Sequence, residues 1–573
     1  MPMTSEFMCD IYEKVISLKR QMKMKRLNII LMSVLLALSS CYKDEGNYDF
    51  TDLNEITVGD DVTSYAVDRY DTLKINPQLQ FSHGTIPDDQ LDFCWEMYLD
   101  DWANSEGTAT LLSKEKNLCV RISKPASVKD YAVVLNVKNK CDGAEYRFKY
   151  NVSVQPSILS GLLVLQNDDG RCRLDYLASP HAEPTFSNAH HIADVYAAAN
   201  ASSVEGEPRG VSFTLVTKSS YEPQVKRVYM WTDKEIVQMD ASDFTRQYAN
   251  AELFMTPPAV VDVKNVVRAG FYNNMSVMIN GTDAHALNQQ TSMSYGYQFS
   301  GVLLPNSSLS GDMQFSKYVY QPDDFSSYTG FDAILYDQKG KRFVKVDHSN
   351  SYEPDLKAFE MQTDANKHIF DVNNIGMNLD WMGKGNGGQG FAVFSNGDAR
   401  YIYRCRFNIK STLENTDGSD SEVEINPQVY SVAMAKYDLC AAENGANAKY
   451  FDVNRYANTL IYATDRDLYV YDFMSKKATR VNDDFPENEK ITAIKIYNVE
   501  YSTSNLNDVS GTLLYVATWD GEEGRVYEFP LNRTSNRLNN RTSATGNLKE
   551  PYAVFAGFGK VVDMCVKCQG FSD

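Results

Sequence analysis

The sequence is poor in histidine and cysteine, the residues that most often bind transition metals. It has 7 His and 10 Cys among 573 residues. Cys565-x-x-Cys568 has no second Cys or His pair nearby at zinc spacing, and no βαβ pattern surrounds it as a redox motif requires. The sequence therefore predicts no metal and no other cofactor. We expect the eight cysteines that follow Cys41 to be core or incidental thiols rather than a disulfide framework.

Short motifs of the common enzyme classes are also missing. The chain contains no Gly-x-Ser-x-Gly, no His-Glu-x-x-His and no Gly-x-x-x-x-Gly-Lys-Ser/Thr. Paired carboxylates serve glycoside cleavage, but the 75 acidic residues make many chance pairs. We therefore expect a protein that is not an enzyme.

Basic residues are outnumbered. There are 56 Lys and Arg against 75 Asp and Glu, which gives a formal charge of −19. Proteins that bind nucleic acids need clustered cations to neutralise phosphates, so nucleic acid is excluded as a partner. Negative charge of this size favours solubility and disfavours anionic partners.

Long apolar runs are absent as well, and 32 Gly and 18 Pro are too few for a low-complexity chain. The apolar run near the N-terminus, Leu27–Leu38, is shorter than the ~20 residues that span a bilayer. Three basic residues precede it and small residues follow, which is the pattern of a secretory signal. The acidic residues among positions 1–21 do not fit such a signal, so we expect translation to start at Met22 or Met24.

The signal ends in Leu38-Ser39-Ser40-Cys41, which resembles the bacterial lipobox. The resemblance implies cleavage after Ser40, diacylglycerol on the Cys41 thiol and an acylated amino terminus. Ordinary cleavage near Ser39, with Cys41 incidental, is the alternative. Several acyl chains on one residue suffice for lasting membrane attachment. Residues 1–40 are thus expected to be a signal with an upstream start, and residues 41–50 a lipidated tether.

Lys43, Asp44 and Glu45 stand immediately after Cys41-Tyr42. They are similar to the Lys-acid-acid signal that sends Bacteroidetes lipoproteins to the outer face of the outer membrane. A solvated charged tether is the alternative. The resemblance implies an outer-membrane lipoprotein that faces the cell exterior.

Residues 51–156 hold about seven strand candidates bounded by turn residues. A region of this size, strand number and turn spacing predicts an Ig-like β-sandwich. Trp95, in Phe93-Cys94-Trp95, stands where such a domain buries a core Trp. The clearest candidates are 55–58, 72–75, 91–99, 118–122, 131–137 and 146–154.

Several short motifs together resemble the PKD-like lipoproteins of Bacteroidetes. Members of this family are usually found beside SusC/SusD-type TonB-dependent importers. The resemblance therefore implies such an importer complex as a partner. The motifs are Cys41-Tyr42-Lys43-Asp44-Glu45-Gly46-Asn47-Tyr48, Asn54-Glu55-Ile56, Phe93-Cys94-Trp95-Glu96, the 131–154 hairpin, and the run from Ala556 to Met564.

Residues 157–573 repeat one unit, a strand, a polar turn and a second strand. Seven copies give a period near 59 residues, longer than the ~40–50 usual for a four-stranded propeller blade. A β-propeller is the economical prediction because radial closure removes sheet edges. Seven blades are favoured over six or eight, two stacked sandwiches are the alternative, and 553–566 is expected to complete the first blade. The copies begin at Gly161, Val228, Ser276, Ala333, Gly390, Thr459 and Leu513.

Candidate site residues in this region are few. His190 and His191 are adjacent, so on a strand they face opposite sides, and we place them in a surface loop. His181 lies near them in sequence, but no Cys or carboxylate is evidently placed to complete a metal site. Trp102, Trp381 and Trp519 are candidates for stacking on sugars or peptides, although strand-core Trp is commoner, and we nominate none as a ligand-binding residue.

The sequence thus predicts an all-β protein, an Ig/PKD-like sandwich followed by a propeller. The resemblance implies a surface lipoprotein that captures peptides or glycans for an importer without catalysis. A surface hydrolase or lyase with an active site built from scattered loops is the alternative, because propellers host both kinds.

Overall fold

A computed structural model describes most of the chain from residue 54 onward. No helix among the residues described is long and apolar enough to cross a membrane. The signal and tether, residues 1–50, lie outside the described part. The described residues are 54–60, 62–100, 109–127, 129–155, 158–186, 188–216, 225–269, 275–287, 297–321, 333–347, 354–359, 369–386, 389–406, 413–414, 423–424, 433–482, 484–499, 509–533 and 550–568.

Among the described residues up to 155, the regular elements are strands and one 3-10 turn, η1 (Asp88–Gln90). Three sheets form, with strand orders β1-β4, β3-β7 and β2-β9-β8-β5-β6. The predicted strands 72–75 and 91–99 are found with those bounds. The strands are β1 (Ile56–Val58), β2 (Ser64–Asp68), β3 (Thr72–Ile75), β4 (Leu79–Phe81), β5 (Leu91–Leu99), β6 (Thr110–Ser113), β7 (Leu118–Arg121), β8 (Tyr131–Asn139) and β9 (Glu145–Gln155).

Trp95 on β5 is a core residue, as the sequence predicts. Its side chain is fully buried, and its ring packs 5.6 Å from that of Tyr150. The indole N–H donates to the Glu115 carbonyl at 3.0 Å, so the one polar atom of the ring is satisfied.

The chain divides into two compact units. The smaller comprises residues 1–61, 76–93 and 136–148, and the larger holds the remainder, including all of 149–573. Pro156 lies outside the described residues, so the domain boundary at 156/157 stays a prediction.

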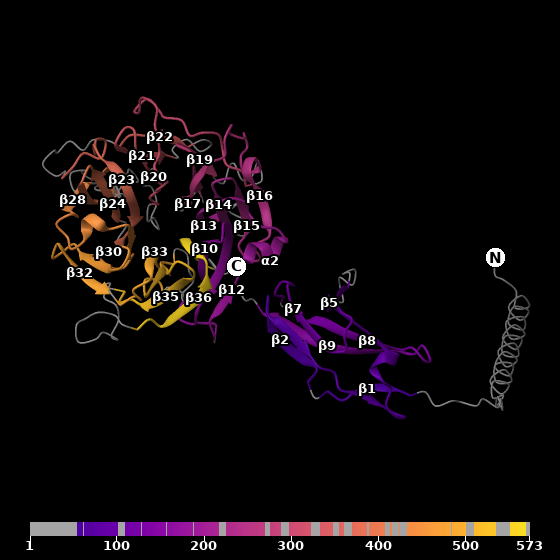
Figure 1. The fold of residues 1–573 in the computed structure, drawn as a ribbon. Coiled ribbons are helices and arrows are strands. Elements are labelled where there is room, and N and C mark those ends of the chain that lie inside the picture. The colour runs from indigo at the N-terminus through magenta and orange to yellow at the C-terminus, as the bar shows by residue number, and fades with distance from the viewer. Residues whose placement is uncertain are drawn as a thin grey trace, which may run out of the picture. The chain divides into compact units, whose positions relative to one another are not determined.

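Residues 158–568 build seven antiparallel sheets of three or four strands, which we number sheet 1 to sheet 7 (Figure 1). In sheet order they are sheet 1, β12 (His190–Ile192), β11 (Arg171–Ala178), β10 (Gly161–Asp168) and β37 (Lys560–Lys567); sheet 2, β13 (Pro208–Val216), β14 (Val225–Thr232), β15 (Ile236–Asp240) and β16 (Arg246–Ala249); sheet 3, β17 (Val263–Ala269), β18 (Met275–Asn280) and β19 (Asp283–Leu287); sheet 4, β20 (Ala333–Asp337), β21 (Arg342–Asp347) and β22 (Asp355–Lys357). They continue with sheet 5, β23 (Asn378–Lys384), β24 (Gln389–Asn396), β25 (Ala399–Arg406) and β28 (Ala433–Asp438); sheet 6, β29 (Tyr450–Val453), β30 (Thr459–Ala463), β31 (Leu468–Asp472) and β32 (Lys477–Asn482); and sheet 7, β33 (Lys490–Ile496), β34 (Leu513–Trp519), β35 (Gly524–Pro530) and β36 (Ala553–Phe558).

Each of the seven predicted hairpins is an antiparallel pair, one in each sheet. Other elements are small. A two-stranded ladder joins β26 (Leu413–Glu414) to β27 (Val423–Glu424). Among the described residues after 157, the helical elements are α2 (Val195–Asn200), which the Asp194 carboxylate caps, and the 3-10 turns η2 (Asn250–Leu253) and η6 (Gly445–Asn447). The all-β class is therefore confirmed.

Alternating side chains of one strand pack against two different sheets. On β10, Leu163 and Leu165 join a buried cluster with sheet 2, whereas Leu162 and Val164 join another with sheet 7. A strand buried on both faces reads as a continuous apolar run, which is why 161–165 shows no polar alternation. Analogous clusters join sheet 2 to 3, 3 to 4, 4 to 5, 5 to 6 and 6 to 7.

The last strand belongs to the first sheet. β37 pairs antiparallel with β10, with Leu162 opposite Val566 and Val164 opposite Met564. The prediction that 553–566 completes the first blade is wrong in one respect. Only β37 joins sheet 1, because β36 pairs with β35 of sheet 7.

Three of the hairpins share a charged clasp that the sequence search passed over. An Asp at the turn pairs with an Arg five residues later, so the ion pair lies across the two strands. The pairs are Asp168–Arg173 at 3.3 Å, Asp337–Arg342 at 3.3 Å and Asp520–Arg525 at 2.8 Å. The polar turn thus fixes each hairpin by a side-chain bond as well as by its backbone.

Lys567, at the end of β37, carries a pH-dependent contribution to stability. It is 2% exposed, and its ammonium donates to the Leu159 carbonyl at 2.7 Å. Burial lowers its pKa to about 8. The unfolded chain, whose Lys pKa is about 10.4, therefore binds more protons between about pH 8 and 10.4, so this residue's contribution rises with pH in that window.

We expect Lys567→Met to remove this contribution. Relative to the variant, the wild type gains up to about 3 kcal/mol of unfolding free energy as pH rises from 8 to 10.4. Urea unfolding from pH 7 to 10 measures it, with the exposed Lys560→Met on the same strand as control. A wild-type advantage that is flat with pH contradicts the assignment.

Candidate functional site

A cavity of about 570 Å³ lies among the seven sheets, and we call it the central cavity. Its wall comes from β13, β17, β23, β29, β33 and β37, together with residues 317–321, which meet sheet 4 through a Tyr320–Ile334 bridge. We call these six strands the inner strands. They contact one another in the order β23, β29, β33, β37, β13, β17. Six of the seven sheets therefore line one site directly, and residues 317–321, which bridge to sheet 4, complete its wall.

The wall of the central cavity is strongly basic. Eight cationic side chains line it against two carboxylates, Asp452 and Asp563, in a chain whose total charge is −19. The local sign of charge is thus opposite to the overall sign. The cationic residues are Arg209, Lys264, Arg268, Lys317, Lys384, Lys449, Arg455 and Lys495.

The two carboxylates join neighbouring inner strands. Asp563 on β37 accepts the backbone N–H of Val211 on β13 at 3.0 Å and that of Met564 at 2.9 Å. Asp452 on β29 accepts the N–H of Ile496 on β33 at 2.7 Å and that of Val453 at 2.9 Å. Each carboxylate oxygen thus already has a backbone donor.

Burial raises the pKa of both carboxyls. Lys495 opposes this shift at each of them, without reversing it. Desolvation weakens the ionised form of an acid. The two acids are therefore poor counterions for the surrounding cations.

Several of the cations are only loosely engaged. Lys264 pairs with Asp262 at 2.7 Å and Lys449 with Asp465 at 2.6 Å, and all four side chains are about half exposed. Exposed pairs of this kind contribute only about 0–1 kcal/mol. Among the described residues Arg209 forms no ion pair. These side chains can therefore turn to a ligand at low cost.

Aromatic rings complete the wall, and two buried polar atoms of wall residues lack a hydrogen-bond partner among the described residues. Trp231 and Trp381 lie over Gly210 and Gly383, where a β-carbon would overlap the indole rings. The Trp231 indole N–H and the Ser212 hydroxyl are buried, and neither has a hydrogen-bond partner in the described part of the chain. A buried polar atom without a partner carries a free-energy cost. Tyr318 and Tyr450 also line the cavity.

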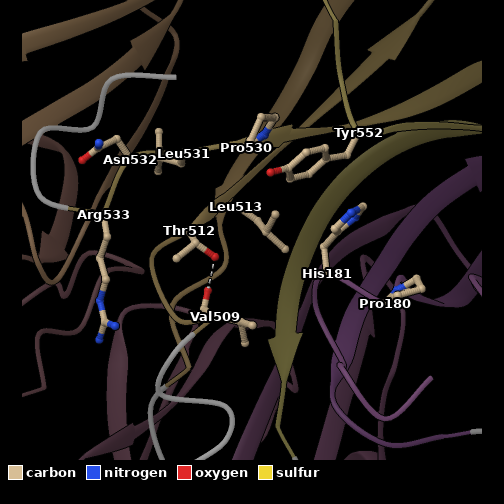
Figure 2. A pocket seen from close by; sticks show the side chains of 10 residues that line it. All are labelled: Pro180, His181, Val509, Thr512, Leu513, Pro530, Leu531, Asn532, Arg533 and Tyr552. Carbon is tan, nitrogen blue, oxygen red and sulfur yellow. Dashed lines mark hydrogen bonds between the residues drawn. The ribbon is translucent and has the colours of Figure 1, made fainter. Parts of the chain in front are cut away.

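A second pocket of about 520 Å³ lies between sheets 1 and 7 (Figure 2). His181 and Tyr552 stack there at a centroid distance of 4.0 Å. Figure 2 shows the two rings side by side at the wall, and the Thr512 hydroxyl turned to the Val509 carbonyl, to which it donates at 2.7 Å.

The carboxylate of Glu528 binds three side chains next to this second pocket. It is fully buried and accepts from Ser179 Oγ at 2.5 Å, Tyr515 OH at 2.7 Å and His181 Nδ1 at 2.8 Å. A carboxylate only accepts, so Nδ1 carries the proton. Ser179 bonds the acid and not the imidazole, so the three groups lack the Ser–His contact of a hydrolytic triad.

The adjacent histidines stand on an edge strand, and their placement in a loop was wrong. β12 pairs with β11, which sets His190 opposite Ala178 and His191 opposite Leu177. His191 Nε2 lies 2.8 Å from the buried carboxylate of Asp175, which also binds Arg173. Burial raises the pKa of Asp175, but bonds from Arg173 and His191 outweigh it, so the pKa is lowered.

These carboxylates are what the sequence search missed. It found none placed for His181 or His191, yet Glu528 and Asp175 serve them from other strands. No group of three or more potential metal ligands occurs among the described residues. Cys565 and Cys568 both line the central cavity, and neither forms a disulfide within the described part of the chain.

The predicted lipidation residue Cys41 and the export residues Lys43, Asp44 and Glu45 lie outside the described part of the chain, as does Trp102. Their roles stay predictions. Of the other Trp candidates, Trp381 lines the central cavity and Trp519 does not. The cationic wall went unnoticed in the sequence because its residues are spread from position 209 to 495.

Comparisons with known proteins give one family match. The model of the PKD-like family matches residues 41–208, so this part of the chain is similar to that family, as the sequence motifs predicted. No curated protein matches the chain.

Solved structures give only distant likenesses. Hsv2 of Kluyveromyces lactis is 11% identical, with 57% of this chain and 75% of that one covered and a TM-score of 0.28. A DUF4784 family protein of Bacteroides caccae is 9% identical, covering 75% and 96%, with a TM-score of 0.26. The Nup133 β-propeller domain of Vanderwaltozyma polyspora is 12% identical, covering 62% and 91%, with a TM-score of 0.28. TM-scores this low carry no argument about function.

Proposed function

We propose that the protein is a surface-exposed outer-membrane lipoprotein that binds a ligand in the central cavity without transforming it. Its accessory role is to capture peptides or glycans for a SusC/SusD-type TonB-dependent importer. The observation that carries the binding role is one cavity lined by six of the seven sheets and by residues 317–321, of a size within the roughly 300–1,000 Å³ typical of small-molecule sites.

In this proposal residues 157–573 form a closed, seven-bladed propeller that follows a PKD/Ig-like sandwich in the sequence. Two contacts support closure. β37 pairs with β10, and sheet 7 shares a buried cluster with sheet 1, in which Tyr515 and Ala517 pack with Leu162 and Val164. Closure gives the cavity a fixed wall and leaves no long sheet edge free.

The lipobox at Cys41, the Lys43-Asp44-Glu45 signal and the PKD-like match support a place on the cell surface. The importer partnership rests on the family resemblance. Lack of the common catalytic motifs supports binding without turnover.

A binding panel with one matched pair of variants tests the function. Mature protein in detergent is titrated with oligosaccharides and peptides by calorimetry, and the mixtures are analysed for products. We expect saturable binding without product. Trp381→Ala should weaken it about tenfold or more, the size of an aromatic contact at a binding centre, whereas Trp519→Ala, outside the cavity, should not.

Both variants must melt like the wild type, because Trp381 also packs 5.9 Å from Phe451. Turnover of any ligand would replace this proposal with the surface hydrolase or lyase. Binding that Trp381→Ala leaves unchanged would move the site elsewhere.

A further inference from the structure

We infer that the ligand of the central cavity is an anionic oligosaccharide, one that carries carboxylates on its sugar rings. The inference rests on the proposed binding function and names its ligand class. It comes from an inversion of charge. Eight cations face two acids in the cavity wall of a chain with a net charge of −19.

The acids do not neutralise this wall. Asp452 and Asp563 each accept two backbone N–H groups, one from the next residue of their own strand and one from a neighbouring strand, and so fasten β29 to β33 and β37 to β13. A cavity lined by one sign of charge and enclosed by protein of low dielectric concentrates its field on a ligand of the opposite sign.

The cations are arranged for capture rather than for stability. Lys264 and Lys449 are held only by exposed pairs, and Lys317 lies over the Tyr318 ring, 5.2 Å from its centroid. Arg209 adds a guanidinium, whose fork of donors matches a carboxylate bidentately. Long basic side chains of this kind can close on a charged ligand from several sheets at once.

The remainder of the wall fits a sugar ring. Trp381 and Tyr450 are partly exposed and offer aromatic faces, which pack against the apolar face of a sugar. Aromatic faces and cations in one cavity favour an acidic saccharide over an acidic peptide.

The test compares one saccharide with and without its charge. The mature protein in detergent is titrated with tetragalacturonate, with its methyl ester and with tetraglutamate, at low and high salt. We expect tetragalacturonate to bind at least tenfold more tightly than the ester, and the advantage to shrink as salt rises.

Variants test whether the cations of the central cavity cause this preference for tetragalacturonate. Arg209→Ala with Lys317→Ala should reduce tetragalacturonate affinity at least tenfold, and Lys449→Ala alone severalfold, should the double variant not fold. Lys138→Ala with Lys339→Ala removes two cations from exposed pairs outside the cavity, and should leave affinity unchanged.

Equal binding of the acid and its ester would overturn the charge inference while leaving the binding function in place. Binding of tetraglutamate in preference to tetragalacturonate would overturn the saccharide assignment. An advantage of the acid that persists in the double cavity variant and in Lys449→Ala would place the anion elsewhere. Binding of none of the three, with no ligand found in the wider panel, would contradict the inference and the proposed function together.

Discussion

Ending the chain at Glu550 is expected to leave the protein insoluble or partly unfolded. The truncation removes β36 and β37. β37 is hydrogen-bonded to β10 and touches β13 and β33, the inner strands on either side of it. Its loss exposes the edge of β10 and opens the wall of the central cavity, and an exposed edge promotes aggregation.

The energetic cost points the same way. Phe558, Val561 and Met564 are each 3% exposed or less, and removing a large buried side chain costs about 2–5 kcal/mol. Domains are stable by only about 5–15 kcal/mol, so three such losses consume most of the margin.

Solubility after expression and a thermal melt measure the result. A chain that ends at Cys568 is the control, because it keeps all of β37 and should melt like the wild type. A soluble 1–550 chain with a cooperative melt would contradict the closed propeller and favour two stacked sandwiches.

Cys41→Ser is expected to release the protein from membranes or to leave an uncleaved precursor. Hydroxyl oxygen does not replace the thiol that the lipobox resemblance assigns to diacylglycerol, and the apolar run that precedes it is too short to be a lasting anchor. Membrane fractionation and the mass of the mature chain measure the result. A processed, membrane-bound Cys41→Ser protein would show that the anchor lies elsewhere.

Replacement of Lys43, Asp44 and Glu45 by Ala is the matched comparison. It leaves Cys41 in place, so lipidation should persist, while the protein should remain on the periplasmic side. Protease added to whole cells distinguishes the two sides. Digestion as complete as in the wild type would reject an export role for these residues.

The all-β class and most strands could be predicted from local pattern. β3 and β5 were placed with their observed bounds, and each predicted hairpin is found, because short β-branched and aromatic runs between turn residues specify strands without help from distant contacts. β2, β4 and β6 were harder to predict because most of their side chains are partly or fully exposed, which weakens the apolar pattern of a strand. The histidine strand β12 is also short, and it forms where Asp175 on β11 binds His191.

Side-chain partners that are far apart in sequence could not be predicted. His181 and Glu528 are 347 residues apart and Val211 and Asp563 are 352 apart, yet both pairs are bonded. No local pattern relates such positions, since the sheets that carry them meet only when the last strand returns to the first. The Asp-x-x-x-x-Arg clasps were the one local signal that could have been found.

The contrast between what the sequence determines and what the fold determines is clearest for charge. The sequence by itself determined the strand content, the repeated hairpin and a net charge of −19, from which anionic partners were disfavoured. Only the tertiary structure decided where each charge lies. It gathers Arg209 of sheet 2, Lys495 of sheet 7 and Lys317 of the segment 317–321 into one cavity, and it places backbone N–H groups against Asp563. Total charge is a sum over the chain, whereas a ligand experiences the field of the few groups that the fold brings within a Debye length of it.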